Sequence, residues 1–203
     1  MNIETYSSDS SYAGLTYGQW TVKWWQWAIS NPSIKNPVVD DTGQFASINQ
    51  PISVWFLAGV LADEKRDRKF PRRECNIPTG RPILIPILNC ETDSVEYPEL
   101  KKDSDLLSHL KKQVDSIENR SCYINSQEVP PVRVRSDPMI FEIYVHPDFD
   151  QKHNKGGLSR AAADGYWVFL KPLPAGKYNI NFEGSCENGR LNSGAEYQVT
   201  VTP

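Results

Sequence analysis

A run without proline, Tyr17–Ile29, constrains this chain more than any other segment, because it holds four tryptophans within eight residues. Trp20, Trp24 and Trp27 recur at i, i+4 and i+7, so a helix places them on one stripe. Apolar side chains also extend around most of the remaining circumference. A helix of this kind is normally buried between other elements, and we interpret the stripe as the part that packs on a sheet.

Trp25 lies off the stripe, and Lys23 and Gln26 belong to a narrow polar strip. Thr16 with Gln19 three residues later fits a capping box, which predicts where the helix begins. Buried indole N–H groups need acceptors, which loop carbonyls can supply.

Because Trp25 lies off the stripe, we take it, with Lys23 and Gln26, as the candidate contact for a small ligand or a protein partner. The protein partner could be a second copy of the chain, which would make a homodimer.

The composition fits one ordinary globular domain. The chain has 203 residues, a formal net charge of −3 and 39% hydrophobic residues, and a chain of this length buries a sizeable core without a metal or disulfide. It has no apolar run of transmembrane length, which argues against a membrane protein. Its near-neutral charge argues against a nucleic-acid partner. We expect residues 1–14 to be a poorly ordered lead and residues 15–203 to form the domain.

The N-terminus lacks the basic and apolar regions of a signal peptide. If the chain is complete at Met1, this favours the cytoplasm; otherwise the protein is expected to be secreted. Cys75 and Cys90 end two strands that we expect to be neighbours, so they are the candidate disulfide pair. Four reduced thiols are the competing interpretation.

Beyond the first helix, short apolar or alternating runs predict strands. A second helix is expected from about Ser104 to Ile117, with Leu106, Leu110 and Val114 on its apolar stripe. Pro86 removes one ladder donor and predicts an edge or a bulge. The predicted strands are Val54–Leu61, Glu74–Ile77, Ile83–Leu88, Cys122–Ile124, Val132–Val134, Met139–His146, Tyr166–Leu170, Tyr178–Phe182 and Tyr197–Val201.

These strands and helices do not alternate, which disfavours a doubly wound parallel sheet. In the C-terminal third, apolar and polar residues alternate one by one, which is typical of antiparallel strands with one buried face and one face exposed to solvent. The prediction is a mainly β (α+β) fold, an antiparallel β-sandwich or jelly-roll with two helices, one Trp-rich near the N-terminus and one in the middle of the chain.

Three runs of the sequence resemble an uncharacterised family of small bacterial proteins. They are YGQWTVKWWQW at 17–27, CNIPTGRPI at 75–83 and GYWVFLKPLPAGKY at 165–178. The resemblance implies a single-domain β-rich fold. It implies no established activity, and no catalytic residue can be carried over from it.

His146 and Asp148 follow a predicted strand, and His153 comes close behind. A His-x-Asp pair at a strand end is typical of the 2-His-1-carboxylate triad of non-haem iron enzymes, which often have β-rich folds. A metal-dependent enzyme using His146 and Asp148 is therefore one alternative. A hydrated loop after a strand explains the same residues, and His153 follows too soon to come from the opposite wall.

The sequence holds no complete catalytic set: it has no GxSxG elbow, no P-loop and no GxGxxG fingerprint. The acidic stretch at 91–99 and the mixed-charge run at 63–74 are expected to be hydrated loops. A carbohydrate-binding module using an exposed Trp is a further alternative. The favoured hypothesis is a non-catalytic β-sandwich protein without a cofactor that binds a small ligand or a protein partner.

Overall fold

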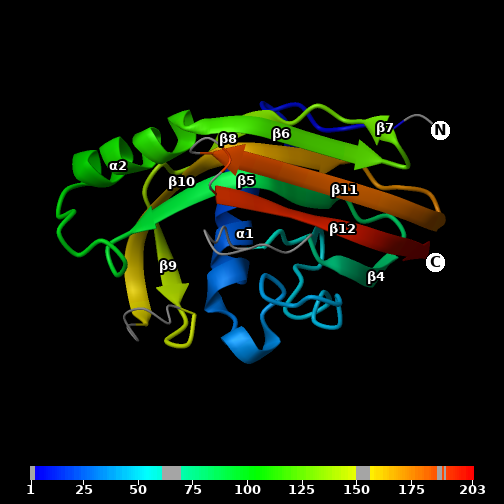
Figure 1. Ribbon diagram of the computed structural model, residues 1–203, viewed down its shortest axis with the longest axis horizontal. Helices are drawn as coiled ribbons and strands as arrows, with labels where there is room; N and C mark the ends of the chain where they lie inside the picture. Colours follow the sequence, from blue (N-terminus) through cyan, green and yellow to red (C-terminus); the bar gives the residue numbers. More distant parts are fainter. Residues whose placement is uncertain (1–2, 61–69, 150–155, 187–188, 190) are drawn as a thin grey trace.

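A computed structural model describes residues 3–60, 70–149, 156–186, 189 and 191–203. The fold is mainly β with two helices, as predicted, and its strands form two large sheets (Figure 1). Helix α1 (Tyr17–Ser30) packs on one sheet, and α2 (Asp103–Asp115) lies at one end of the molecule. No helix in the described parts of the chain is long and apolar enough to cross a membrane.

We call the two large sheets sheet I and sheet II. Sheet I contains, in order, β3 (Trp55–Phe56), β5 (Ile83–Asp93), β10 (Gly157–Leu170) and β8 (Val132–Arg135), with β9 (Phe141–Val145) paired to the start of β10. Sheet II contains, in order, β4 (Arg72–Pro78), β12 (Leu191–Thr202), β11 (Gly176–Cys186), β6 (Ile117–Ile124) and β7 (Gln127–Glu128). The remaining short elements are β1 (Ser11–Tyr12), β2 (Leu15–Thr16) and η1 (Ser33–Lys35).

The sheets are mixed, so the expectation of a purely antiparallel sandwich needs correction. Strand β3 runs parallel to β5, and β4 runs parallel to β12. Both exceptions join strands that no hairpin connects. A tight turn forces antiparallel pairing, whereas an edge strand added from elsewhere in the chain is free to pair either way.

Several strand limits also differ from the sequence-based expectation. The apolar run from Val54 is buried through Val60, yet only Trp55–Phe56 is strand, and Leu61 lies outside the described residues. Strand β5 continues to Asp93, into the stretch predicted to be a loop, and β10 starts at Gly157 instead of Tyr166. The polar end of β5 pairs with β10, and the polar start of β10 pairs with β9. Pairing with a neighbouring strand therefore makes these segments β-strands although their polar composition favours a loop.

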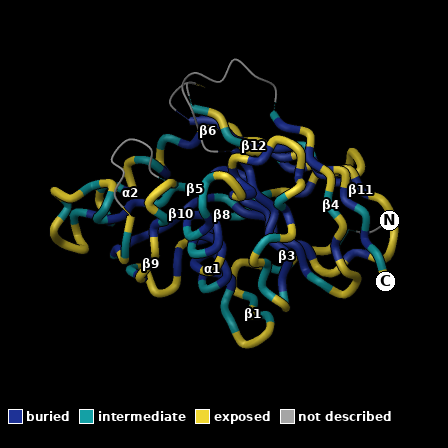
Figure 2. The backbone as a smooth tube through the Cα atoms, turned by 90° about the horizontal axis from the view of Figure 1, so that it is seen from below, coloured by how far each residue is buried: buried dark blue, intermediate teal, exposed yellow. Residues whose placement is uncertain are grey.

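The Trp stripe packs on sheet I, as predicted. The Trp24 ring meets Trp167 of β10 edge-on at 5.4 Å between centroids, and Trp20 meets Phe56 of β3 at 6.2 Å. The indole N–H groups of Trp20, Trp24 and Trp27 donate to the carbonyls of Tyr12, Leu57 and Ile48. The Thr16–Gln19 capping box forms as expected. Figure 2 shows α1 as mostly buried backbone beside the sheet.

The N-terminal segment makes more contact with the domain than its composition predicts. The backbone N–H of Tyr6 donates to Phe169 O at 2.8 Å, and the N–H of Lys171 donates to Glu4 O at 2.9 Å. The Tyr6 ring packs on Phe169 at 4.8 Å between centroids. Residues 3–12 of the lead therefore cover the end of β10, because two tyrosines in this polar stretch supply an apolar contact.

Candidate functional site

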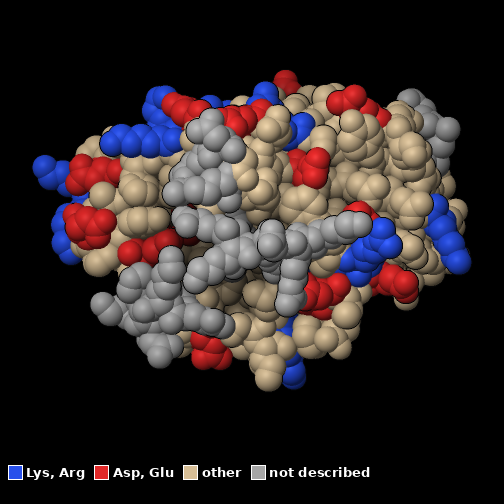
Figure 3. Space-filling model, viewed as in Figure 1, with Lys and Arg blue, Asp and Glu red and all other residues tan. Residues whose placement is uncertain are grey.

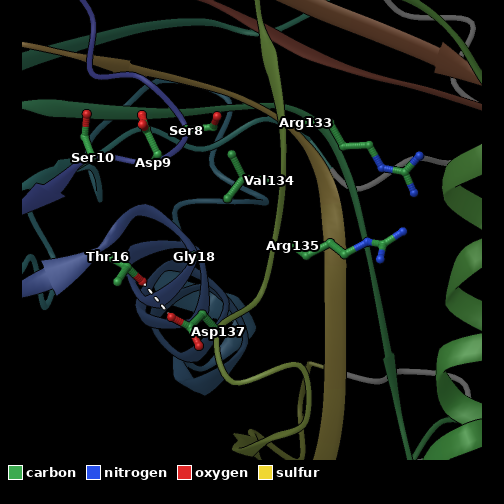
Figure 4. A pocket seen from close by; sticks show the side chains of 9 residues that line it. All are labelled: Ser8, Asp9, Ser10, Thr16, Gly18, Arg133, Val134, Arg135 and Asp137. Atoms are coloured by element: carbon green, nitrogen blue, oxygen red, sulfur yellow. Dashed lines mark hydrogen bonds between the residues drawn. The ribbon is translucent and has the colours of Figure 1, made fainter.

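One hollow, with a volume of about 610 Å³, lies where α1 begins (Figure 4). Thr16 Oγ1 donates to Asp137 Oδ2 at 2.9 Å inside it. Arg133 and Arg135 line it with their backbone, but their side chains point toward α2. Both guanidinium groups bind the buried carboxylate of Asp164. Thr16 and Asp137 thus pair with each other, and both arginines pair with Asp164 outside the hollow, which is typical of a structural network.

A smaller and more apolar cleft lies between α1 and the edge of β5, and we call it the Trp25 cleft. Its volume is about 60 Å³. Trp24, Trp25, Ala28 and Ile29 of α1, Pro86–Asn89 of β5, and Val38, Gly59, Val60, Phe149 and Ser193 line it. Among these described lining residues there is no titratable side chain, and the hydroxyl of Ser193 already donates to Val60 O at 2.7 Å.

The cleft exists because β5 has no neighbouring strand along this stretch of its edge. Strand β3 pairs only with Ile83 and Leu84. Pro86, which has no N–H to offer a neighbour, follows two residues later. The sequence-based expectation of an edge or a bulge at Pro86 is confirmed on both counts, since the register of β5 against β10 also shifts here.

The bulge determines which side chains face α1. Pro86 pairs with Trp167 and Leu88 with Tyr166, so Ile87 is the extra residue. Ile87 packs in the core between the sheets, and Leu88 packs beside α2 on the same side of sheet I. Without the bulge, strict alternation would send Asn89 to that side as well. With it, Asn89 turns to the α1 side and lines the Trp25 cleft.

Two side chains that line the cleft each carry a buried nitrogen with no hydrogen-bond partner within the described structure: Trp25 Nε1 and Asn89 Nδ2. Trp25 is only 8% exposed. Leaving a buried donor unpaired costs about 1–3 kcal/mol, so such groups generally have a partner that is water or a ligand. Trp55 and Trp167 also carry unpartnered indole nitrogens, but they do not line this cleft.

Arg73 of β4 supports the wall of the cleft from behind. Its side chain is fully buried at 1% exposure. Nη1 donates to the carbonyls of Ala58 and Gly59, and Nη2 donates to Val38 O at 3.3 Å. Gly59 and Val38 are themselves lining residues. No ion pair joins Arg73 to a carboxylate of the described residues, so its positive charge is balanced there only by backbone and hydroxyl oxygens.

Glu91 lies two residues beyond Asn89 on the same face of β5. Its Oε1 is buried and has no partner among the described residues. Burial, together with repulsion from Asp93 and Glu96, raises the pKa of the Glu91 carboxyl well above its ordinary value. The uncharged, protonated form of Glu91 is therefore favoured.

The other predicted contact residues of α1 do not join Trp25. Gln26 Nε2 donates to Glu142 O of β9 at 2.9 Å, and Lys23 Nζ lies 3.4 Å from the Gln26 amide oxygen. Neither side chain lines the Trp25 cleft in the described structure. Gln26 instead bonds a backbone carbonyl of β9, so part of the polar strip joins the helix to sheet I.

The predicted metal residues are only partly within the described structure, since His153 lies outside it. His146 Nδ1 accepts a hydrogen bond from the backbone N–H of Asp148 at 3.2 Å and lies 3.7 Å from Asp148 Oδ2. This is a local turn contact. Among the described residues, no group of three His, Cys, Asp or Glu side chains is placed to hold a metal ion.

The candidate disulfide is wrong. Cys75 is in β4 of sheet II and Cys90 is in β5 of sheet I, so the two strands are not neighbours, and the cysteines form no disulfide. Burial raises the pKa of both thiols to about 12. Such thiols are unreactive at neutral pH.

The surface features that the sequence singled out give no further site. All six tryptophans are at most 8% exposed, so none offers an open face on which a sugar could stack. Lys and Arg are interspersed with Asp and Glu on the face in Figure 3. Residues 61–69, which carry most of the mixed-charge run, lie outside the described residues.

Comparison with protein-family models, curated proteins and solved structures found no match. The resemblance to small bacterial proteins stays a prediction. Sequence reasoning selected Trp25 but missed Asn89 and Arg73. Pro86 was the one signal near Asn89, because it pointed to a bulge. Arg73 stands in a run of charged residues, where nothing distinguishes a buried arginine from hydrated ones.

Proposed function

We propose that this protein is a non-catalytic binding protein that takes a small ligand in the Trp25 cleft. The observation that carries the proposal is the pair of buried donors, Trp25 Nε1 and Asn89 Nδ2, which line one apolar cleft without a partner among the described residues. Ligand sites combine an apolar lining with a few polar groups that fix orientation, and this cleft has both features.

The chemistry of the lining favours binding over catalysis. A general acid or base must lie within hydrogen-bond reach of the reacting group, and no His, Cys, Asp, Glu or Lys lines the cleft in the described structure. The Ser193 hydroxyl donates to a backbone carbonyl and has no base beside it.

The size of the cleft favours a small molecule over a protein partner. One water needs roughly 10–15 Å³ of such volume, so a cleft of about 60 Å³ accepts a molecule of about four to six heavy atoms. A protein surface would place no more than one side chain there. A homodimer stays a prediction, and the mass of the protein in solution tests it.

Nuclear magnetic resonance of the ¹⁵N-labelled protein tests the proposal directly, because each indole N–H gives its own signal. We expect fragments of four to six heavy atoms, screened across charge classes, to shift the Trp25 indole signal in a saturable way. Trp25→Phe keeps an aromatic ring but removes the donor, and should weaken binding at least tenfold. Because this variant lacks the Trp25 indole signal, its binding is followed by the backbone amide signals of the other lining residues.

Trp55→Phe is the matched control. It removes an indole N–H that also lacks a partner in the described structure but lies outside the cleft, so fragment affinity should stay within twofold of the unaltered protein. If no fragment moves the Trp25 signal, or if Trp25→Phe binds fragments as the unaltered protein does, the proposal is wrong.

A further inference from the structure

The two unpartnered nitrogens on side chains that line the Trp25 cleft are both hydrogen-bond donors. An indole nitrogen and an amide nitrogen can donate but cannot accept, so the ligand has to supply acceptor oxygens. We infer that the cleft selects a short-chain aliphatic carboxylate, whose two oxygens accept from Trp25 Nε1 and Asn89 Nδ2 while its alkyl chain lies against the apolar lining. This inference rests on the proposed function and names the ligand class of that same site.

The positive charge of Arg73 favours an anionic ligand over a neutral one. Its guanidinium donates to the carbonyls of Val38 and Gly59, two residues that line the cleft. It forms no ion pair with a carboxylate of the described residues. A buried cation without a counter-charge is costly. A carboxylate on the other side of this wall would lower that cost, whereas an ammonium group would raise it.

Nearby acidic groups do not cancel this preference. Glu91 is the carboxyl group nearest to Asn89 along the strand, and its burial beside Asp93 and Glu96 raises its pKa, which favours the uncharged form. Asp93 Oδ1 accepts hydrogen bonds from Ser159 Oγ and from the backbone N–H groups of Val95 and Glu96. These bonds fix the Asp93 carboxyl group at the end of β5 that lies beyond Asn89 and Glu91.

The volume and the lining set the length of the chain. Four to six heavy atoms correspond to propionate or butyrate. Ala28, Ile29 and Phe149 supply apolar contacts for the two or three alkyl carbons of these chains. A dicarboxylate would bury a second charge against these side chains, which nothing in the described lining compensates.

The test compares four-carbon ligands of similar shape on the unaltered protein. Butyrate, butyramide and n-butylamine are titrated separately while the Trp25 indole signal is followed at fixed pH and ionic strength. Butyrate should bind at least tenfold more tightly than n-butylamine. Butyramide, which keeps an acceptor oxygen but loses the charge, should lie between them.

Asn89→Asp tests the same inference from the protein side, because it replaces the donor by an acceptor of nearly the same shape. It should weaken butyrate at least tenfold and reduce or reverse the preference over n-butylamine. Asn76→Asp is the matched control: it makes the same change in net charge at an exposed position of β4, and should alter butyrate affinity less than twofold.

The outcomes separate this inference from the proposed function. If n-butylamine or butyramide binds as tightly as butyrate, or if Asn89→Asp leaves butyrate affinity unchanged, the cleft is a small-molecule site but not a carboxylate site, and the inference is overturned. If no ligand of any class moves the Trp25 signal, the proposed function fails and the inference fails with it.

Discussion

Arg73 shows how one side chain can satisfy several backbone carbonyls. After β3, the N–H of Leu57 donates to Leu84 O of β5 and the N–H of Val60 to Gly194 O of β12. Between them, the carbonyls of Ala58 and Gly59 accept from Arg73. Arg73 Nε also donates to Asp40 O at 2.6 Å, and Nη1 lies 3.0 Å from the Tyr197 hydroxyl. One buried guanidinium therefore joins the loop before β3, the segment after it, and sheet II.

Replacing Arg73 should destabilise the fold strongly. Arg73→Met keeps much of the buried stem but leaves several carbonyls unpaired, so we expect the free energy of unfolding to fall by about 3–5 kcal/mol. Arg72→Met is the matched control, because Arg72 is 81% exposed in its ion pair with Glu196 and should cost about 1 kcal/mol or less. Urea denaturation measures both, and equal costs would contradict this account of Arg73.

Glu91 predicts a pH dependence of stability. Its folded pKa is raised above the ordinary value of 4.5, so between that value and the folded pKa the native state binds more protons than the unfolded state. The free energy of unfolding then falls as pH rises through this window. Glu91→Gln removes the effect, and its stability relative to the unaltered protein should increase between pH 5 and pH 8.

Glu99→Gln makes the same chemical change at an exposed loop position and controls for the loss of one carboxyl group. Urea midpoints at the two pH values should change in parallel for Glu99→Gln and the unaltered protein. A parallel change for Glu91→Gln as well would show that Glu91 has an ordinary pKa in the folded protein.

At the scale of elements, the β5–β10 pair positions the cleft. The two strands approach most closely where Gly165 faces Asn89: a Cβ atom on Gly165 would lie 2.4 Å from Asn89 Cα. Gly165→Ala should therefore separate the strands and cost about 1–3 kcal/mol. It should also shift the Trp25 indole signal. An unchanged unfolding free energy would mean that the strands tolerate the methyl group and that the pairing is looser than described.

The elements differ in how far the sequence predicts them. Helix α1 was predicted with its capping box and its Trp stripe, because these signals depend only on local spacing. The bulge at Ile87 was anticipated only through Pro86. Its consequence for Asn89 was not, because the face to which a residue turns after a bulge depends on the partner strand. The parallel pairing of β3 with β5 and of β4 with β12 was missed because it also depends on the partner strand.

At the scale of the whole molecule, the Trp-rich helix has two uses. Three of its tryptophans fill the core beside sheet I and donate to loop carbonyls, as the sequence predicted. The Trp25 ring packs edge-on against Trp24 at 5.0 Å between centroids and also lines the cleft beside β5, with its donor unpaired in the described structure. The candidate site thus depends on the helix, on the bulged strand and on the loop held by Arg73. Local sequence predicted the helix and, through Pro86, the bulge, but not the buried position of Arg73.

The central claim is that the Trp25 cleft holds a ligand through its two donors. A high-resolution crystal structure of the protein grown with butyrate tests it most directly. The account predicts a bound molecule with oxygen atoms about 2.7–3.2 Å from both Trp25 Nε1 and Asn89 Nδ2. A cleft that stays empty at saturating butyrate, or in which protein atoms accept both hydrogen bonds, would contradict it.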